Sequence, residues 1–85
     1  MEYSVMEKIL SGINIGEKIL IEGGDNSGFT LRHITGIYNG DTKESVILEN
    51  VTEEYIYGRP VEGKIVKKES GVYMKYHVYN IKKLD

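Results

Sequence analysis

The apolar residues of the first twelve positions recur at helical spacing, one stripe formed by Val5, Met6, Ile9 and Leu10. Ser4 followed by Glu7 matches the capping-box pattern, and Gly12 offers a left-handed helix end. The pattern predicts a helix of about two turns over residues 4–11. So short a helix needs packing against the rest of the chain to persist.

After position 16 the apolar residues come in short runs rich in β-branched and aromatic side chains, a texture typical of hairpin-connected strands. Asn39-Gly40 is the strongest turn signal, because both residues tolerate the positive φ of a tight hairpin. Further breaks fall at residues 23–28, 57–60 and 69–71, the second of which holds the single proline, Pro60. The predicted strands are 17–23, 29–38, 44–51, 62–68 and 72–83.

One short helix and five strands in 85 residues predict an all-β fold, namely a small, five-stranded, strongly bent barrel of Sm-like, SH3-like or OB-like type. A barrel is favoured over an open sheet because an open sheet leaves two bare edges. Residues 1–85 are expected to form a single domain, with the barrel at about 16–84. A chain this short buries only about 60–65% of its unfolded surface, so oligomerisation would help to stabilise it.

Composition excludes several function classes. The chain has no cysteine, which excludes disulfides, a thiol nucleophile and Cys-based zinc sites. Its two histidines, His33 and His77, lie far apart without carboxylates at ligand spacing, so no metal site and no cofactor are expected. No apolar run approaches the roughly 18 residues that span a bilayer, and no signal-peptide pattern is present. We therefore expect a soluble, cytoplasmic protein without membrane contact.

No grouping of side chains meets the spacing that catalysis needs. Residues 23–28 (GGDNSG) lack the lysine and the following helix of a phosphate-binding P-loop, so a long hairpin turn is the better interpretation. Glu53 and Glu54 are adjacent, so on a strand they point to opposite faces and cannot act as an acid/base pair. The protein is not expected to be an enzyme.

Residues 35–53 resemble a known family. Sm-like proteins carry a glycine in the second strand and the pattern Asn-apolar-apolar-Leu-x-Asn-small-x-Glu in the third. Residues 45–53 (SVILENVTE) follow the third-strand pattern, and residues 35–41 (TGIYNGD) resemble the second strand and its turn. A glycine at position 36 is sensible where a barrel strand turns a corner. The chain thus resembles a divergent member of the Sm-like (LSm and Hfq-type) family.

This resemblance implies an RNA-binding site. Eukaryotic and archaeal members carry Arg-Gly between the last two strands and Hfq-type members Tyr-Lys-His, whereas this chain has Lys75-Tyr76-His77. The family's uridine pocket uses an Asp and an Asn before the third strand; Asp41 lies one position from the acid's place, and Ser45 takes that of the Asn. The expected RNA-binding residues are Tyr38, Asn39, Asp41, Lys75, Tyr76 and His77.

Charge is distributed unevenly along the chain. Residues 1–63 hold eleven acidic against five basic residues, a net charge of −6, whereas residues 64–85 hold six lysines against two acids, a net charge of +4. A polyanion would bind the C-terminal segment, although lysines also protect exposed strand edges.

Strand parity predicts two faces for the C-terminal segment. One face would carry Tyr73, Lys75, His77 and Tyr79, and the other Val72, Met74, Tyr76 and Val78. Aromatic rings interleaved with cations suit single-stranded nucleic acid, and Lys64, Lys67 and Lys68 would extend such a face. Alternatively, these tyrosines cover a barrel rim or a subunit interface.

Two hypotheses follow. The first is an Sm-like module that binds single-stranded RNA and self-associates into a homo-oligomeric ring by pairing the edge strands of neighbouring barrels. The alternative is a non-catalytic accessory module, for example viral or from a mobile element, that binds a protein or a small ligand through its acidic first two-thirds.

Overall fold

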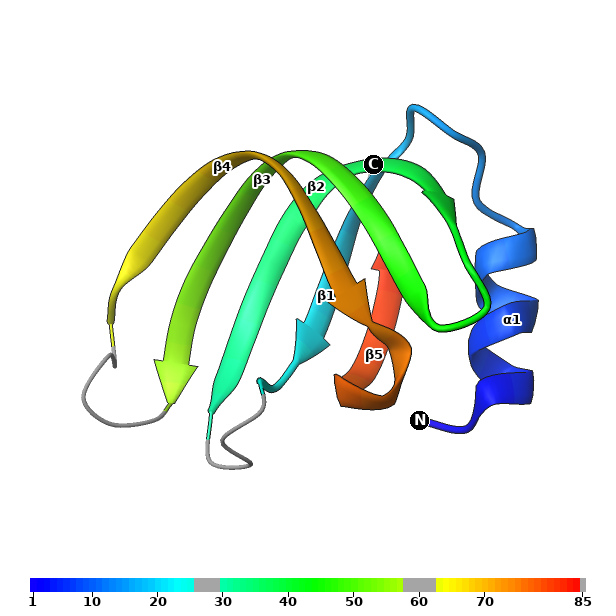
Figure 1. Ribbon diagram of the computed structural model, residues 1–85, viewed down its shortest axis with the longest axis horizontal. Helices are drawn as coiled ribbons and strands as arrows, with labels where there is room; N and C mark the ends of the chain where they lie inside the picture. The colour runs from blue at the N-terminus through cyan, green and yellow to red at the C-terminus, as the bar shows by residue number, and fades with distance from the viewer. Residues whose placement is uncertain (26–29, 58–62, 85) are drawn as a thin grey trace.

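The computed structural model describes residues 1–25, 30–57 and 63–84 (Figure 1). In chain order the elements are helix α1 (Tyr3–Ser11), strands β1 (Lys18–Gly23), β2 (Leu31–Asp41), β3 (Ser45–Tyr57) and β4 (Ile65–Met74), the 3₁₀ turn η1 (Lys75–His77) and strand β5 (Val78–Lys83). The strands form one antiparallel sheet in the order β4-β3-β2-β1-β5. The sheet is strongly bent, and α1 lies beside one open end of the curve (Figure 1). The predicted all-β fold with a short N-terminal helix is confirmed.

The apolar core fills the concave side of the sheet and is closed by α1. Along β1 burial alternates, so that Ile19 and Ile21 face inward, as the two-residue period of a strand requires. From the helix, Met6 and Leu10 reach the same cluster. The remaining core side chains are Ile13, Ile34, Tyr38, Val46, Leu48, Val51, Tyr73, Val78 and Ile81. None of the described helices is long and apolar enough to cross a membrane.

Two residues allow the long central strands to bend. A Cβ on Gly36 would lie 3.0 Å from the carbonyl oxygen of Glu49 and 3.2 Å from the Cβ of Leu48, so β2 and β3 approach closely only because a glycine stands there. The β2–β3 register shifts at this point. On β3, Asn50 has a φ of 50°, a left-handed conformation that asparagine tolerates better than most residues. The predicted need for a glycine at a strand corner is confirmed.

The helix differs from its prediction at both ends. It begins at Tyr3 with Glu2 at the N-cap position and without a side-chain cap, so the predicted capping box of Ser4 and Glu7 is wrong. Glu7 is occupied elsewhere, by an ion pair described below. Gly12 has a φ of −90°, so the predicted left-handed stop is wrong as well.

Two predicted turns are absent. Asn39-Gly40 lies inside β2, where Gly40 (φ 93°) accommodates a register irregularity, and the chain turns only at residues 42–44. Strand β4 runs without interruption through the predicted break at 69–71, where Ser70 and Gly71 pair with Glu49 and Leu48 on β3. The predicted turns at 23–28 and 57–60, with Pro60, fall largely outside the described residues.

Candidate functional site

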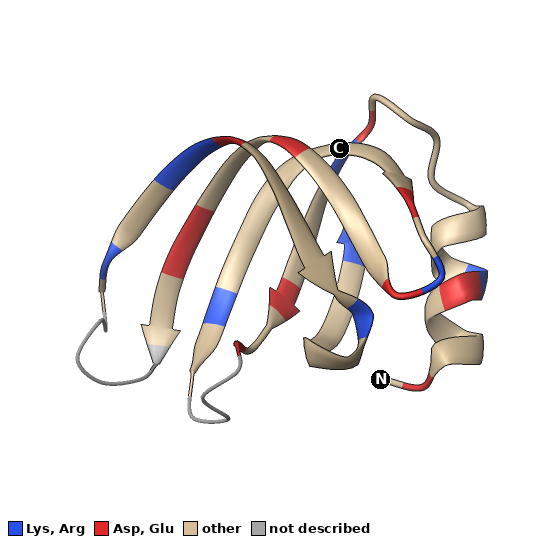
Figure 2. Ribbon diagram, viewed as in Figure 1, with Lys and Arg blue, Asp and Glu red and all other residues tan. Residues whose placement is uncertain are grey.

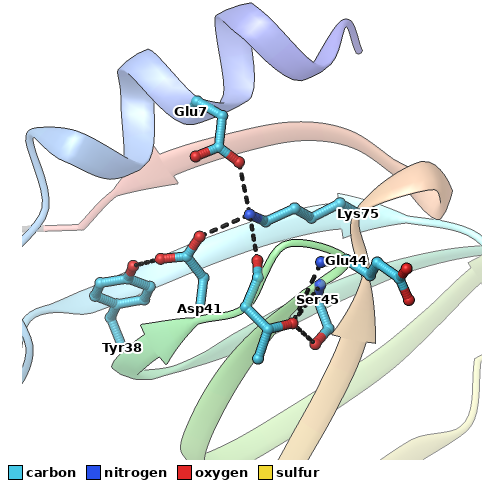
Figure 3. Close-up of polar contacts among 7 residues, drawn as sticks. Glu7, Tyr38, Asp41, Glu44, Ser45 and Lys75 are labelled. Carbon is cyan, nitrogen blue, oxygen red and sulfur yellow. Dashed lines mark hydrogen bonds and ion pairs between the residues drawn. The ribbon is translucent and has the colours of Figure 1, made fainter.

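Lys75 joins three segments that are distant in sequence. Its side chain is only 1% exposed, and its Nζ donates to Glu7 Oε1 at 2.7 Å, to Asp41 Oδ2 at 2.6 Å and to the carbonyl oxygen of Thr42 at 2.6 Å (Figure 3). An ammonium group has three protons, so these three acceptors use all of them. Lys75 therefore ties α1 to the turn between β2 and β3.

The charges of this cluster stabilise one another. Burial works to lower the pKa of Lys75, but hydrogen bonds to Asp41 and Glu7 outweigh it and raise that pKa. Burial likewise works to raise the pKa of Asp41, but hydrogen bonds from Lys75 and Tyr38 lower it overall. The Tyr38 hydroxyl donates to Asp41 Oδ1 at 2.7 Å, and burial followed by this bond raises the pKa of Tyr38 to about 12. At neutral pH the lysine and the aspartate are thus both charged, and the tyrosine keeps its proton.

The turn between β2 and β3 is closed by hydroxyl groups. The hydroxyls of Thr42 and Ser45 lie 2.7 Å apart, and Thr42 Oγ1 accepts the backbone N–H groups of Ser45 at 3.1 Å and Glu44 at 3.3 Å. Ser45 is buried, at the place where the family resemblance has an asparagine. Its side chain therefore shapes the turn from within.

A hollow of about 690 Å³ opens between α1 and this turn. It is lined by Tyr3, Glu7, Asp41, Thr42, Lys43, Glu44 and Lys75. Three carboxylates against two lysines give the lining of the hollow a net charge of −1. Glu7 and Asp41 share the ammonium group of Lys75. Figure 2 shows the acidic and basic positions of α1 and of the β2–β3 turn along the backbone.

The turn η1 presents an aromatic ring beside this cluster. Tyr76 is 60% exposed, and its ring meets that of His77 edge-on at a centroid distance of 4.2 Å. The N–H of Lys75 donates to the carbonyl oxygen of Glu44 at 2.8 Å, which fixes the start of η1 against the β2–β3 turn. The exposed ring of Tyr76 thus projects from a turn whose first residue, Lys75, is fixed to the β2–β3 turn.

The predicted parity of the C-terminal segment is wrong. Because residues 75–77 form a 3₁₀ turn, the two-residue alternation of a strand is lost there. Tyr73 and Lys75 are buried while Tyr76 and Tyr79 are exposed. The expected face of interleaved rings and cations at positions 73, 75, 77 and 79 therefore does not form.

Three of the six expected site residues are brought together by the fold: Tyr38, Asp41 and Lys75 are linked by hydrogen bonds. Tyr76 and His77 follow Lys75 in η1 without lining the same hollow, and His77 lines a second one. Asn39 is exposed on β2 and its Nδ2 donates to Glu49 Oε1 at 3.1 Å. Sequence reasoning missed Glu7 and Thr42 as members of the cluster. Glu7 was assigned to a helix cap, and Thr42 takes part through its backbone, which leaves no trace in the sequence.

The lysines expected to extend the site lie on β4 or just before it. Lys64 and Lys67 are exposed, whereas Lys68 forms an ion pair with the buried carboxylate of Glu53 at 3.0 Å. Arg32 also approaches Glu53, at 3.5 Å, and donates to the carbonyl oxygen of Gly24 at 2.6 Å. Among the described residues, no group of three or more His, Asp or Glu side chains is arranged to hold a metal ion.

Comparisons with known proteins identify the fold. The chain matches no protein-family model, and it matches no curated protein sequence. Among solved structures it is similar to a heptameric archaeal Sm protein, with 18% identity over 96% of this chain and 98% of that one and a TM-score of 0.62. It is also similar to the SmAP1 heptamer of P. aerophilum, with 17% identity over 100% and 99% of the two chains and a TM-score of 0.65. The chain therefore has the Sm fold, as the run at residues 45–53 predicted.

Proposed function

We propose that this chain, with its Sm fold, is a divergent Sm-like protein that binds single-stranded RNA and assembles into a homo-oligomeric ring. The observation that carries the RNA-binding part is the exposed ring of Tyr76 on η1. A base that stacks on an aromatic side chain gains about 1–3 kcal/mol, provided that the ring is accessible and held in place. Tyr76 meets both conditions, because its side chain is 60% exposed and the preceding residue is anchored at three points.

The expected site residues divide into two roles in this proposal. Tyr76 contacts the RNA by stacking, and His77 packs against that ring in a T-shaped arrangement. Tyr38, Asp41 and Lys75 hold the turns in place and do not meet phosphate, because their polar groups already bind one another. Exposed lysines such as Lys43, on the turn beside η1, supply the attraction for the RNA backbone.

The ring part of the proposal rests on the two edges of the sheet. In the strand order β4-β3-β2-β1-β5, one side of β4 and one side of β5 face no strand of the described sheet. Each edge exposes large apolar or aromatic side chains, Ile65 and Val72 on β4 and Tyr79 on β5. Pairing β4 of one copy with β5 of the next would satisfy both edges and cover these side chains. The two similar solved structures are both described as heptamers.

RNA binding is tested by fluorescence anisotropy with labelled uridine-rich and adenine-rich single strands. We expect binding that weakens as salt rises, with a log–log slope of about −0.7 for each phosphate neutralised. Absence of binding to either strand at low salt would overturn the RNA-binding proposal. Sedimentation of the protein alone tests the ring, since a monomer at micromolar concentration would overturn that part.

A second candidate function is supported by the acidic lining of the hollow beside α1. Glu7, Asp41 and Glu44 line it against Lys43 and Lys75, and the resulting net charge of −1 favours a cationic ligand over a polyanion. A non-catalytic module that binds a basic protein segment or a small cationic ligand on the same fold would use this surface. An assembled protein that fails to bind any single strand at low salt would favour this candidate.

A further inference from the structure

We infer that Glu7 is a positioning residue of the RNA-binding face: through Lys75 it holds α1 against the β2–β3 turn and against η1, from which Tyr76 projects. This inference rests on the proposed function. Glu7 and Lys75 stand 68 positions apart in the sequence, yet Glu7 Oε1 and Lys75 Nζ lie 2.7 Å apart (Figure 3). Glu7 contributes to one wall of the hollow, and Tyr3, one helical turn earlier, contributes to the same wall.

The geometry separates this role from a contact with RNA. Lys75 is 1% exposed and its three protons are taken by Glu7, Asp41 and Thr42, so it has no donor left for a phosphate. Its own backbone N–H binds Glu44, which places the first residue of η1 directly on the β2–β3 turn. Loss of the Glu7 contact therefore alters the position of Lys75, and with it the position of Tyr76, the next residue in the chain.

Glu7 is the partner of Lys75 that can be removed with the least damage to the fold. Its side chain is 54% exposed, whereas Asp41 is also bound by Tyr38 and the Thr42 acceptor belongs to the backbone. The buried side chains of Met6 and Leu10 keep α1 attached to the core without it. Glu7→Gln removes one negative charge and weakens the ion pair, while Asp41 and the carbonyl oxygen of Thr42 still accept from the buried ammonium group of Lys75.

Positioning and simple electrostatics predict opposite signs for Glu7→Gln. If only charge mattered, removing a carboxylate from an acidic hollow would strengthen the binding of a polyanion, and a released Lys75 would add a phosphate contact. If Glu7 positions the face, the same change weakens binding, because η1 and the β2–β3 turn lose their tie to α1. Glu44→Gln is the matched control: it removes the same charge from the same hollow, but Glu44 contacts Lys75 through its backbone carbonyl alone.

The experiment compares the wild type, Glu7→Gln, Glu7→Asp and Glu44→Gln by anisotropy with a labelled single-stranded RNA over a series of salt concentrations. We expect Glu7→Gln to weaken binding roughly 3- to 30-fold, the range for side chains that act on a site without touching its ligand. Its salt slope should equal that of the wild type, Glu7→Asp should recover part of the affinity, and Glu44→Gln should bind as tightly as the wild type or more tightly.

Two results distinguish failure of this inference from failure of the proposed function. Binding by Glu7→Gln as tight as that of Glu44→Gln, or with a salt slope steeper by about 0.7, overturns the inference and leaves the RNA-binding proposal standing. A wild type that binds no RNA overturns the proposed function itself. Circular dichroism and thermal melting of each variant confirm that any loss of affinity belongs to a folded protein.

Discussion

The hydroxyl of Tyr73 on β4 donates to the buried carboxylate of Glu53 on β3 at 2.5 Å. Lys68 and Arg32 bind the same carboxylate, so Glu53 is surrounded by donors from β2 and β4. Burial works to raise its pKa, but the hydrogen bonds from Tyr73 and Lys68 and the charge of Arg32 lower it overall. This carboxylate holds the edge strand β4 against the rest of the sheet.

Removal of that hydroxyl should destabilise the fold. Tyr73→Phe leaves a buried charged oxygen with one donor fewer, and hydrogen bonds to charged groups contribute about 1.5–3 kcal/mol. Urea unfolding measures the free energy, and Tyr76→Phe, on the exposed turn, serves as a control that should change it by less than about 0.5 kcal/mol. Equal stability of the two variants would contradict the role given to Glu53.

The corner of β2 should not accept a larger residue. In Gly36→Ala the added Cβ would press on the carbonyl oxygen of Glu49 at 3.0 Å, and forcing atoms into a packed interior costs roughly 1–3 kcal/mol. Gly12→Ala is the matched change, because Gly12 has a negative φ and its nearest atom would be 3.5 Å away. Thermal unfolding should show a lower Tm for the first variant alone; a normal Tm for Gly36→Ala would show that the strands separate freely.

Stability should fall in acid through Asp41 and Glu53. Both have a lowered pKa in the folded state, so their contribution is present above the ordinary carboxyl pKa of about 4 and is lost as the pH falls through the lowered values. Asp41→Asn should reduce stability at pH 7 and make its loss below pH 4 shallower than in the wild type. Urea unfolding at a series of pH values checks this, and parallel curves for the two proteins would exclude a contribution from Asp41.

RNA affinity should depend on the ring at position 76. Tyr76→Phe keeps an aromatic face and should bind RNA as the wild type does, whereas Tyr76→Leu keeps the bulk without the ring and should lose about 1–3 kcal/mol of binding. Anisotropy titrations at one salt concentration measure both. Similar affinities for the Leu and Phe variants would show that RNA does not stack on this residue.

Assembly should depend on the edge of β4. Val72 is 63% exposed on this strand, and Val72→Lys places a charge where the next copy would pack. We expect a lower mass by sedimentation, with the fold retained in circular dichroism. Ile15→Lys is the control, since Ile15 is 70% exposed but lies on the connection before β1, beside Gly40 of the central strand β2. An unchanged mass for the Val72 variant would place the interface elsewhere.

Local sequence patterns predicted the elements of the fold because each pattern acts over a few residues. Alternation around Ile19 and Ile21 and the third-strand run at 45–53 indicated strands that the structure contains, and Gly36 indicated the corner. The family resemblance then placed these strands in the right fold.

Longer-range contacts explain the failures. A lysine is usually exposed, and Lys75 is buried only because acceptors 68, 34 and 33 positions away converge on it. The turn signal at 69–71 fails because Gly71 makes room within a strand: a Cβ there would collide with the ring of Tyr73, whose hydroxyl donates to Glu53, 20 positions away. No local pattern encodes either relationship.

The two sheet edges differ in kind, since β4 and β5 are different strands at opposite ends of the strand order. Contacts in the proposed ring are consequently head-to-tail, and joining two or three copies still leaves one bare β4 and one bare β5 at the ends. Every open chain of copies thus carries the same two unsatisfied edges as the monomer, and the closed cycle alone has none. The contact that closes the ring would therefore add one interface without recruiting another copy of the chain. Partial rings are consequently scarce, and assembly is close to all-or-none.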